Sequence, residues 1–140
     1  MNIRRKARET ALQVLYRIDI AEDRSEEAVE RDMESLPEGT EARRYSEEIV
    51  WGVAAHSKEI DSLIEAHSEN WTLDRMAVVD RNVLRVAVYE LLYTETPYKV
   101  IIDEAVELAK RYGSEESSAF INGLLDKIRK GWDRSARTTA

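Results

Sequence analysis

The stretch VVDRNVLRVAVYELLY, residues 78–93, decides the fold class of this 140-residue chain. Between Val83 and Leu92 it is almost wholly apolar, with only two charged residues. A helix that is apolar on most of its faces is a central one, because it has no side left to turn toward water. Thr96-Pro97 ends the pattern, since a proline disfavours helical backbone at the residue before it. We therefore expect a central helix with other helices packed around it.

The segments on the N-terminal side of this helix also show helical periodicity, and no segment alternates apolar with polar residues as a strand would. The first segment, from about Ile3 to Ala21, carries an apolar stripe formed by Ala7, Ala11, Val14, Leu15 and Ile18. Ser25 is a good N-cap for a short second helix. Thr40 can cap a long third helix, which keeps its apolar period as far as His67.

The segments on the C-terminal side are separated by turn signals. SENWTLDRM, residues 68–76, interrupts the periodicity and indicates a subdomain boundary, with a short helical turn around Leu73 to Met76. A further helix covers about Val100 to Tyr112, and Gly113 is its expected C′ residue. Ser114 is expected to cap a last helix, with acidic residues in its first turn.

These elements predict an all-α fold, a compact bundle of six or seven helices in two subdomains. The N-terminal three-helix subdomain would span residues 1–70 and the C-terminal helical subdomain residues 71–134, with a disordered tail at 135–140. A chain of this length can bury roughly two-thirds of its unfolded surface, so its core needs no covalent support. No apolar run approaches the ~20 residues that span a bilayer. We therefore expect a soluble, cytoplasmic protein without membrane contact.

The residue types argue against an enzyme. The chain contains no cysteine, which excludes a disulfide framework and a thiolate metal site. His56 and His67 lie on one expected helix, roughly 16 Å apart by the helical rise, which is too far to share a metal. The five glycines stand singly, so a phosphate-binding loop is unsupported. We expect no catalytic residue, no metal and no cofactor.

Charge is unevenly distributed along the chain, whose formal net charge is −7. Residues 1–8 hold four basic and no acidic residues, and residues 127–140 hold five basic residues and one acidic residue. Residues 9–126 hold 12 basic and 27 acidic residues. Basic ends on an acidic body suggest that the ends meet a polyanion. A solvated helix start and a frayed tail would give the same counts, so charge alone leaves both interpretations open.

Three apolar side chains stand off the expected core stripes. On a helical wheel Leu12 and Tyr16 lie away from the core side, near Arg5, which is the composition of a partner site. A neighbouring helix could equally cover them. Phe120, the only phenylalanine, lies at the edge of the last stripe. It is either core or a stacking platform for an unpaired base, and an aromatic platform with basic residues is what single-stranded RNA requires.

Four motifs, taken in order, resemble the NusB family of transcription antitermination factors. They are RRKARETALQVLY, VDRNVLRVAVYELLY, PYKVIIDEAVELAKRYGSEES and FINGLLDKI. The resemblance covers about Arg4 to Ile128. It implies an all-helical, non-enzymatic protein that acts in antitermination on ribosomal RNA operons. Such a protein binds the boxA element of nascent, single-stranded RNA as a heterodimer with NusE, a small-subunit ribosomal protein, and joins other Nus factors on RNA polymerase.

The resemblance also implies which residues contact RNA. The arginine-rich N-terminal motif of the family falls on Arg4, Arg5, Lys6 and Arg8. Gln13 is a further expected contact, Phe120 matches an aromatic that stacks on a boxA base, and Glu116 matches an acidic residue near that RNA. Position 6 departs from the family pattern, because lysine replaces the bidentate fork of an arginine with a point charge.

For the partner, Tyr16 and Asp80 match family positions that face NusE, and the wheel adds Leu12. Asp80 could instead be a simple helix cap. Two rival interpretations remain. The same fold precedes a methyltransferase domain in some RNA-modifying enzymes, which would require this chain to be a shortened one. A homodimer that buries Leu12 and Tyr16 is the other.

Overall fold

The computed structural model of the protein describes residues 3–69 and 71–131. Those residues form seven α-helices and one short 3₁₀ helix, and none of them belongs to a strand. The elements are α1 (Ile3–Ala21), α2 (Glu26–Asp32), α3 (Glu41–Ala55), α4 (Ser57–His67), η1 (Leu73–Arg75), α5 (Val78–Tyr93), α6 (Tyr98–Tyr112) and α7 (Ser117–Gly131). This confirms the all-α prediction with seven helices. The tail predicted at 135–140 lies outside the described residues.

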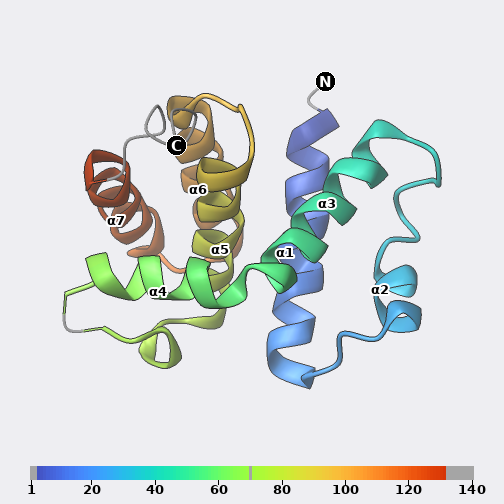
Figure 1. Ribbon diagram of the computed structural model, residues 1–140, viewed down its shortest axis with the longest axis horizontal. Coiled ribbons are helices and arrows are strands. Elements are labelled where there is room, and N and C mark those ends of the chain that lie inside the picture. Colours follow the sequence, from blue (N-terminus) through green and yellow to red (C-terminus); the bar gives the residue numbers. More distant parts are fainter. Residues whose placement is uncertain (1–2, 70, 132–140) are drawn as a thin grey trace.

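Helix α5 is the centre of the molecule, as its sequence predicts. It packs against α1, α3, α4, α6 and α7. In Figure 1, α1, α2 and α3 lie on one side of it, and α4 and α7 lie on the other. Eleven of its sixteen residues are buried. Each fully buried valine or leucine stabilises the fold by about 1.5–3 kcal/mol, so α5 supplies a large part of the core. None of the described helices has the length and apolar character needed to cross a membrane.

The first two predicted N-caps are confirmed. The Ser25 hydroxyl accepts a hydrogen bond from the backbone N–H of Ala28 at 3.3 Å. The Thr40 hydroxyl accepts one from the backbone N–H of Arg43, also at 3.3 Å. Each satisfies a donor that the first turn of a helix leaves without a partner, which fixes where α2 and α3 begin.

The long third helix predicted from Thr40 to His67 is wrong, because the chain forms two helices that meet at His56. His56 has φ −116° and ψ 26°, outside the helical range, and α4 turns away from α3 there (Figure 1). Its N–H still donates to the Gly52 carbonyl at 3.0 Å, and its carbonyl accepts from Ile60 at 2.9 Å. Hydrogen bonding and apolar period therefore continue across the break, and periodicity alone cannot reveal it.

The position of α4 bears on the subdomain boundary predicted at residue 70. Helix α4 buries Ile60 and Ile64, and it packs against α5 and α7. Helix α3 instead packs against α1 and α5. We propose that the boundary lies at His56 and that α4 belongs to the C-terminal subdomain. A fragment of residues 57–131 should then keep more helical circular dichroism than a fragment of residues 71–131; equal helicity per residue would place the boundary at 70.

Helix α7 begins two residues later than predicted, at Ser117 rather than directly after Ser114. A tight turn precedes it, in which the Ser117 hydroxyl accepts from the Ser114 N–H at 2.9 Å. This turn packs on the end of α6, and a Cβ on Gly113 would lie 2.5 Å from the Ser117 hydroxyl oxygen. Gly113 is therefore required by close approach and not by a left-handed backbone, because its φ is −100°.

Candidate nucleic-acid and partner surface

The structure divides the N-terminal basic cluster into a buried part and an exposed part. Arg8 is buried, with only 3% of its side chain exposed. Its Nε and Nη2 atoms each donate to Glu90 at 2.9 Å, and the Glu90 side chain is 1% exposed. The Tyr45 hydroxyl donates to the same carboxylate. Burial and the adjacent Glu90 charge raise the pKa of Tyr45 to about 12. Arg8 is thus a core residue, and its predicted place on an RNA-contacting surface is wrong.

Arg5 forms a similar pair, but at the surface. Its Nε and Nη2 atoms donate to the two oxygens of Glu104 at 3.0 Å and 2.8 Å, while 47% of its side chain remains exposed. The hydrogen bond from Arg5 holds the pKa of Glu104 below its usual range. Arg8 also reaches Glu104, at 3.7 Å. The guanidinium of Arg5 is therefore oriented by a carboxylate but still open to an anion.

Arg4 and Lys6 complete the exposed part. The Arg4 guanidinium lies over the Tyr45 ring, 4.2 Å from its centroid, and the rest of the side chain is exposed. Such cation–π packing orients the charge without neutralising it. Lys6 is exposed and makes no ion pair with the residues that the structure describes. Three of the four predicted basic contacts therefore stand together at the exposed start of α1.

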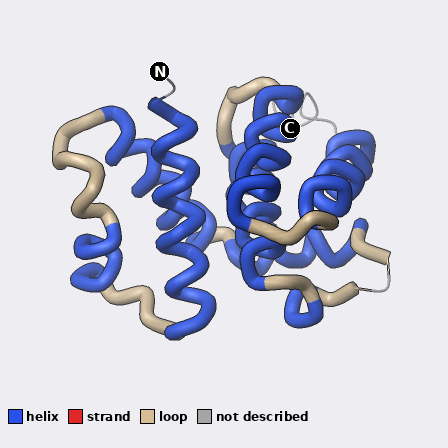
Figure 2. Tube along the Cα trace, turned by 180° about the vertical axis from the view of Figure 1, so that it is seen from behind, coloured by secondary structure: helices blue, strands red, loops and turns tan. Residues whose placement is uncertain are grey.

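A groove connects this end of α1 with α7. It has a volume of about 850 Å³. Its polar and charged lining comes from Arg5 of α1, from α6 and from α7, and three of these side chains are acidic: Arg5, Asp103, Glu104, Glu107, Lys110, Ser118 and Asn122. Helix α6 lies behind α5 in Figure 1, and Figure 2 shows the molecule from this side. Ser118 and Asn122 lie two residues before and after Phe120, so they face the opposite side of α7, and Phe120 does not line this groove.

Phe120 lies between the core and the surface, so the structure fits both of the interpretations that the sequence left open. It is partly buried and packs against the core. Its remaining surface lines a separate pocket of about 420 Å³, which it shares with Glu116, Trp71 and Asp80. Glu116 is exposed, as an RNA-facing residue must be. The ring is therefore anchored on one side and available on the other.

The predicted partner residues differ in exposure. Tyr16 is 39% exposed, in agreement with its place off the core stripe. Leu12 is only 3% exposed, so the prediction that it lies on the surface is wrong. Helix α1 packs against α2, α3 and α5, and these helices leave little of its circumference uncovered. Gln13 is exposed, and so is Ile20, which is four residues beyond Tyr16 and shares its face. Periodicity around Tyr16 could have indicated Ile20.

Asp80 lies in the first turn of α5 and is 9% exposed. Its Oδ1 atom is buried and has no hydrogen-bond partner among the described residues. Ala77 is the N-cap of α5, with no side-chain capping bond, so nothing supports the alternative that Asp80 is a cap. A buried, unpaired carboxylate oxygen is costly to a fold, which makes Asp80 a candidate for contact with a ligand or partner.

A polar network fixes the end of α1 beside the start of α5. Arg81 donates to both oxygens of Asp19, at 2.7 Å and 2.8 Å. Arg85 and Asn82 donate to the same carboxylate. The hydrogen bond from Arg81 lowers the pKa of Asp19 to about 2. Tyr16 lies on α1 and Asp80 on α5, and this network holds the two helices together. The sequence does not show this link, because the two residues are far apart along the chain.

Side chains that could bind a metal do not cluster in the part of the chain that the structure describes. No group of three or more histidine, aspartate or glutamate side chains there could hold a metal ion. The exposed features are instead a basic helix end, a groove and an aromatic pocket. Fold and surface together define an all-helical binding protein whose basic edge suits a polyanion.

Comparison with known proteins assigns the chain to a family. The family model for NusB matches residues 5–130, so the chain belongs to the NusB family. Transcription antitermination protein NusB of Anaeromyxobacter sp. (strain Fw109-5) is 54% identical over 97% of this chain and 96% of that protein. Its counterpart in Myxococcus xanthus (strain DK1622) is 50% identical over 91% of this chain and 95% of that protein. This confirms the resemblance and agrees with a non-enzymatic antitermination factor.

Solved structures give the same result for the fold. T. maritima NusB superposes with a TM-score of 0.84 at 36% identity, covering 98% of this chain and 97% of that chain. A crystal structure of antitermination factors NusB and NusE in complex with dsRNA superposes with a TM-score of 0.85 at 34% identity. It covers 94% of this chain and 99% of that chain.

Proposed function

We propose that this protein binds the boxA element of nascent ribosomal RNA transcripts together with NusE and so joins other Nus factors on RNA polymerase. One observation carries the proposal. An acidic protein exposes three basic residues together at the start of α1, and on α7 a partly buried phenylalanine lines a surface pocket. In a related crystal structure, NusB is in complex with NusE and RNA.

The surface offers a division of labour for single-stranded RNA. Arg4, Arg5 and Lys6 would meet phosphates, which supply most of the affinity and carry no sequence information. Phe120 would stack on an unpaired base. Exposed Gln13 and Glu116 offer hydrogen-bonding groups for sugars or base edges. Arg8 takes no part, because Glu90 neutralises it within the core.

For NusE, the exposed face of α1 around Tyr16 is the proposed contact. Ile20 extends this face by one turn, so that two apolar side chains lie together on an otherwise polar surface. Aromatic anchors of this kind dominate the energy of protein interfaces. Leu12 would contribute only by supporting Tyr16 from inside.

The test is fluorescence anisotropy of a boxA RNA and a scrambled RNA, with and without purified NusE, at two salt concentrations. We expect boxA to bind more tightly than the scrambled RNA, and NusE to tighten binding further. Binding should weaken with salt as phosphate contacts are lost. If neither RNA binds in any combination, the basic end is only a solvated helix start and the proposed function is wrong.

A further inference from the structure

A pocket on the surface joins parts of the chain that are distant in sequence. It has a volume of about 420 Å³ and lies between η1, the start of α5 and the first turns of α7. Its lining includes Trp71, Arg75, Met76, Asp80, Glu116 and Phe120. Two of these residues are expected RNA contacts, one is an expected NusE contact, and the others have no expected role.

The pocket has two aromatic walls. Trp71 is 50% exposed, although tryptophan is the side chain with the most apolar area to hide. Phe120 also lines the pocket and is held by the core. A planar ring can contact such faces with little regard to its identity, which is how proteins hold unpaired bases. The aromatic lining therefore favours a flat, conjugated ligand over an aliphatic one.

Asp80 gives the pocket a chemical preference. It is nine-tenths buried, it lines the pocket, and its Oδ1 atom lacks a partner among the described residues. A carboxylate only accepts hydrogen bonds, so this atom requires an N–H or O–H from the occupant. Adenine, cytosine and guanine each carry an exocyclic amino group. Uracil offers a single N–H between two carbonyl oxygens, which a carboxylate would repel.

Charge around the rim sets how an occupant enters. Asp80 and exposed Glu116 disfavour a phosphate inside the pocket. Exposed Arg75 at the rim makes no ion pair with the described residues, so it can meet a phosphate outside. A nucleotide would therefore insert its base and leave its phosphate at the edge, as in recognition of splayed single strands.

We propose that this pocket binds one unpaired RNA base that carries an amino group, with the base against Trp71 and Phe120 and its amino group donating to Asp80. The inference rests on the proposed function and adds Trp71 as a second aromatic contact and Asp80 as the residue that reads the base. Glu116 and Phe120 of the lining are expected RNA contacts, and exposed Arg75 at the rim can meet a phosphate, which favours RNA over a protein side chain as the occupant.

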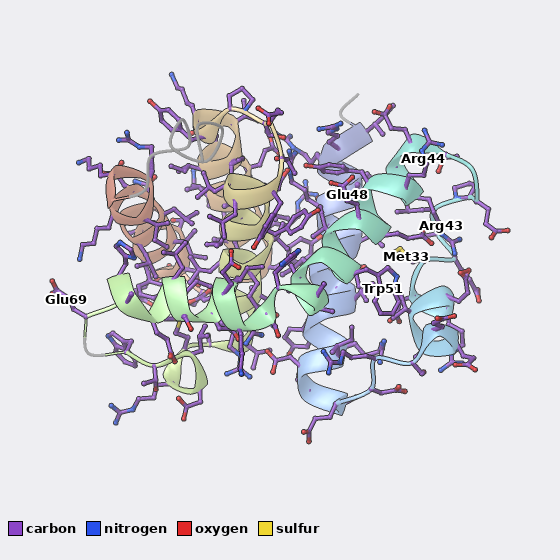
Figure 3. All side chains as sticks on the ribbon, viewed as in Figure 1. Met33, Arg43, Arg44, Glu48, Trp51 and Glu69 are labelled. Atoms are coloured by element: carbon purple, nitrogen blue, oxygen red, sulfur yellow. The ribbon has the colours of Figure 1, made fainter. Side chains whose placement is uncertain are left out.

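The first experiment compares two exposed tryptophans. Trp51 is 38% exposed and lies between α3 and α2 (Figure 3), in a groove with Glu26, Glu30 and Glu47 that should repel RNA. Trp71→Ala should weaken boxA binding roughly tenfold, a loss typical of one stacked base. Trp51→Ala should leave it unchanged. Equal affinities for both variants and the native protein would overturn the inference. Unchanged melting temperatures confirm that both variants fold.

The second experiment tests the base preference. Each amino-bearing base of boxA is replaced in turn by uracil, and binding is measured for the native protein and for Asp80→Asn. At one position the native protein should lose affinity several-fold, and Asp80→Asn should lose that discrimination because its amide can also donate. The same discrimination in both proteins would show that Asp80 does not read the base.

A direct readout uses Trp71 as its own probe. In a protein with Trp51→Phe and Trp132→Phe, Trp71 is the only tryptophan, and boxA should quench its fluorescence on stacking. Quenching by boxA supports the inference, and an unchanged spectrum at saturating RNA contradicts it.

Two further results separate this inference from the proposed function. If the double variant Arg4→Ala with Arg5→Ala loses RNA binding and Trp71→Ala does not, the proposed function stands and the proposal of a base-binding pocket is wrong. If the Trp71 and Asp80 variants bind RNA normally but bind NusE more weakly, the pocket is a protein-binding site and the proposal that it binds an RNA base is wrong. Absence of RNA binding by the native protein, with and without NusE, would reject both.

Discussion

Arg5 and Arg8 lie one turn apart on α1, and each donates two hydrogen bonds to the carboxylate of a glutamate. The Arg8–Glu90 pair is buried, at 3% and 1% exposure, whereas 47% of the Arg5 side chain meets solvent. A buried charge that loses its partner cannot be rehydrated, while an exposed one can. The same arginine–glutamate ion pair therefore stabilises the core at Arg8, whereas at Arg5 it leaves a cation on the surface that a ligand can contact.

The largest effect is expected from Glu90→Gln, which removes the carboxylate that binds Arg8 and leaves, among the described residues, only Glu104, 3.7 Å away, as counter-ion for this buried charge. We expect a loss of about 3–5 kcal/mol in the free energy of unfolding, measured by urea denaturation. Glu41→Gln, at an exposed position on α3, should change it by less than about 0.5 kcal/mol. Similar free energies of unfolding for Glu90→Gln and Glu41→Gln would show that the buried Arg8–Glu90 pair does not stabilise the fold more than an exposed charge does.

The next effect concerns ligand binding by the exposed part of the cluster. Arg4→Ala combined with Arg5→Ala should weaken RNA binding at least roughly tenfold at low salt and lower the salt slope by about 1–2. The matched control is Arg31→Ala with Arg44→Ala, which removes the same charge from exposed positions on α2 and α3. Anisotropy titrations at several salt concentrations measure both. An equal loss of RNA affinity in the control would show that only the net charge of the protein matters, and not the position of Arg4 and Arg5.

A third, intermediate pair extends the comparison to pH. Asp19 is held by Arg81, and its pKa falls from 3.8 to about 2 in the folded protein. A depressed pKa stabilises the fold above the unfolded value near pH 4, and this stability is lost as the pH falls toward 2. Partial exposure reduces the effect to roughly 1–2 kcal/mol.

The matching experiment follows urea denaturation of the native protein and Asp19→Asn from pH 5 to pH 2. The variant should be less stable at pH 5, and its stability should fall less steeply below pH 4. Parallel pH profiles for the two proteins would show that the Asp19–Arg81 pair contributes nothing.

The smallest effect is expected from Glu104→Gln, which loosens the pair between exposed Arg5 and buried Glu104. Stability should change by less than about 1 kcal/mol, since Arg5 can be solvated. RNA binding should tighten about twofold at low salt and not at high salt, because a carboxylate that competes with phosphate has gone. Glu41→Gln again serves as control. Weaker RNA binding would mean that Glu104 helps by orienting Arg5 more than it hinders by its charge.

The sequence predicts this fold well where one local rule decides. The apolar character of residues 78–93 can only be satisfied at the centre, and α5 is there. Ser25 and Thr40 cap their helices because capping needs only a hydroxyl and the next turn. The break at His56 escapes detection because a change in φ and ψ at one residue redirects the helix axis while hydrogen bonds and apolar spacing persist.

Candidate site residues are harder to predict, since their roles depend on what packs around them. Arg8 and Arg5 are equivalent in sequence and both pair with a buried glutamate, so only the burial of the arginine side chain itself, 3% exposed in Arg8 and 47% in Arg5, distinguishes them. Leu12 stands off the stripe of its own helix, but α1 is covered on more than one side. The sequence does not indicate a role for Trp71, because the proposed role depends on its position beside Phe120 of α7 and Asp80 of α5 in one pocket.

The Arg8–Glu90 pair also has a consequence for synthesis of the chain. Its two residues are 82 positions apart, and Arg5 and Glu104 are 99 positions apart. A ribosome adds roughly 5–20 residues per second, so α1 waits for roughly 4–20 s before either glutamate is made. During that interval the nascent N-terminus presents all four of its cations beside unburied apolar side chains. Translation speed over residues 9–104 therefore sets how long the unfinished chain is open to chaperones and to the ribosome's own RNA.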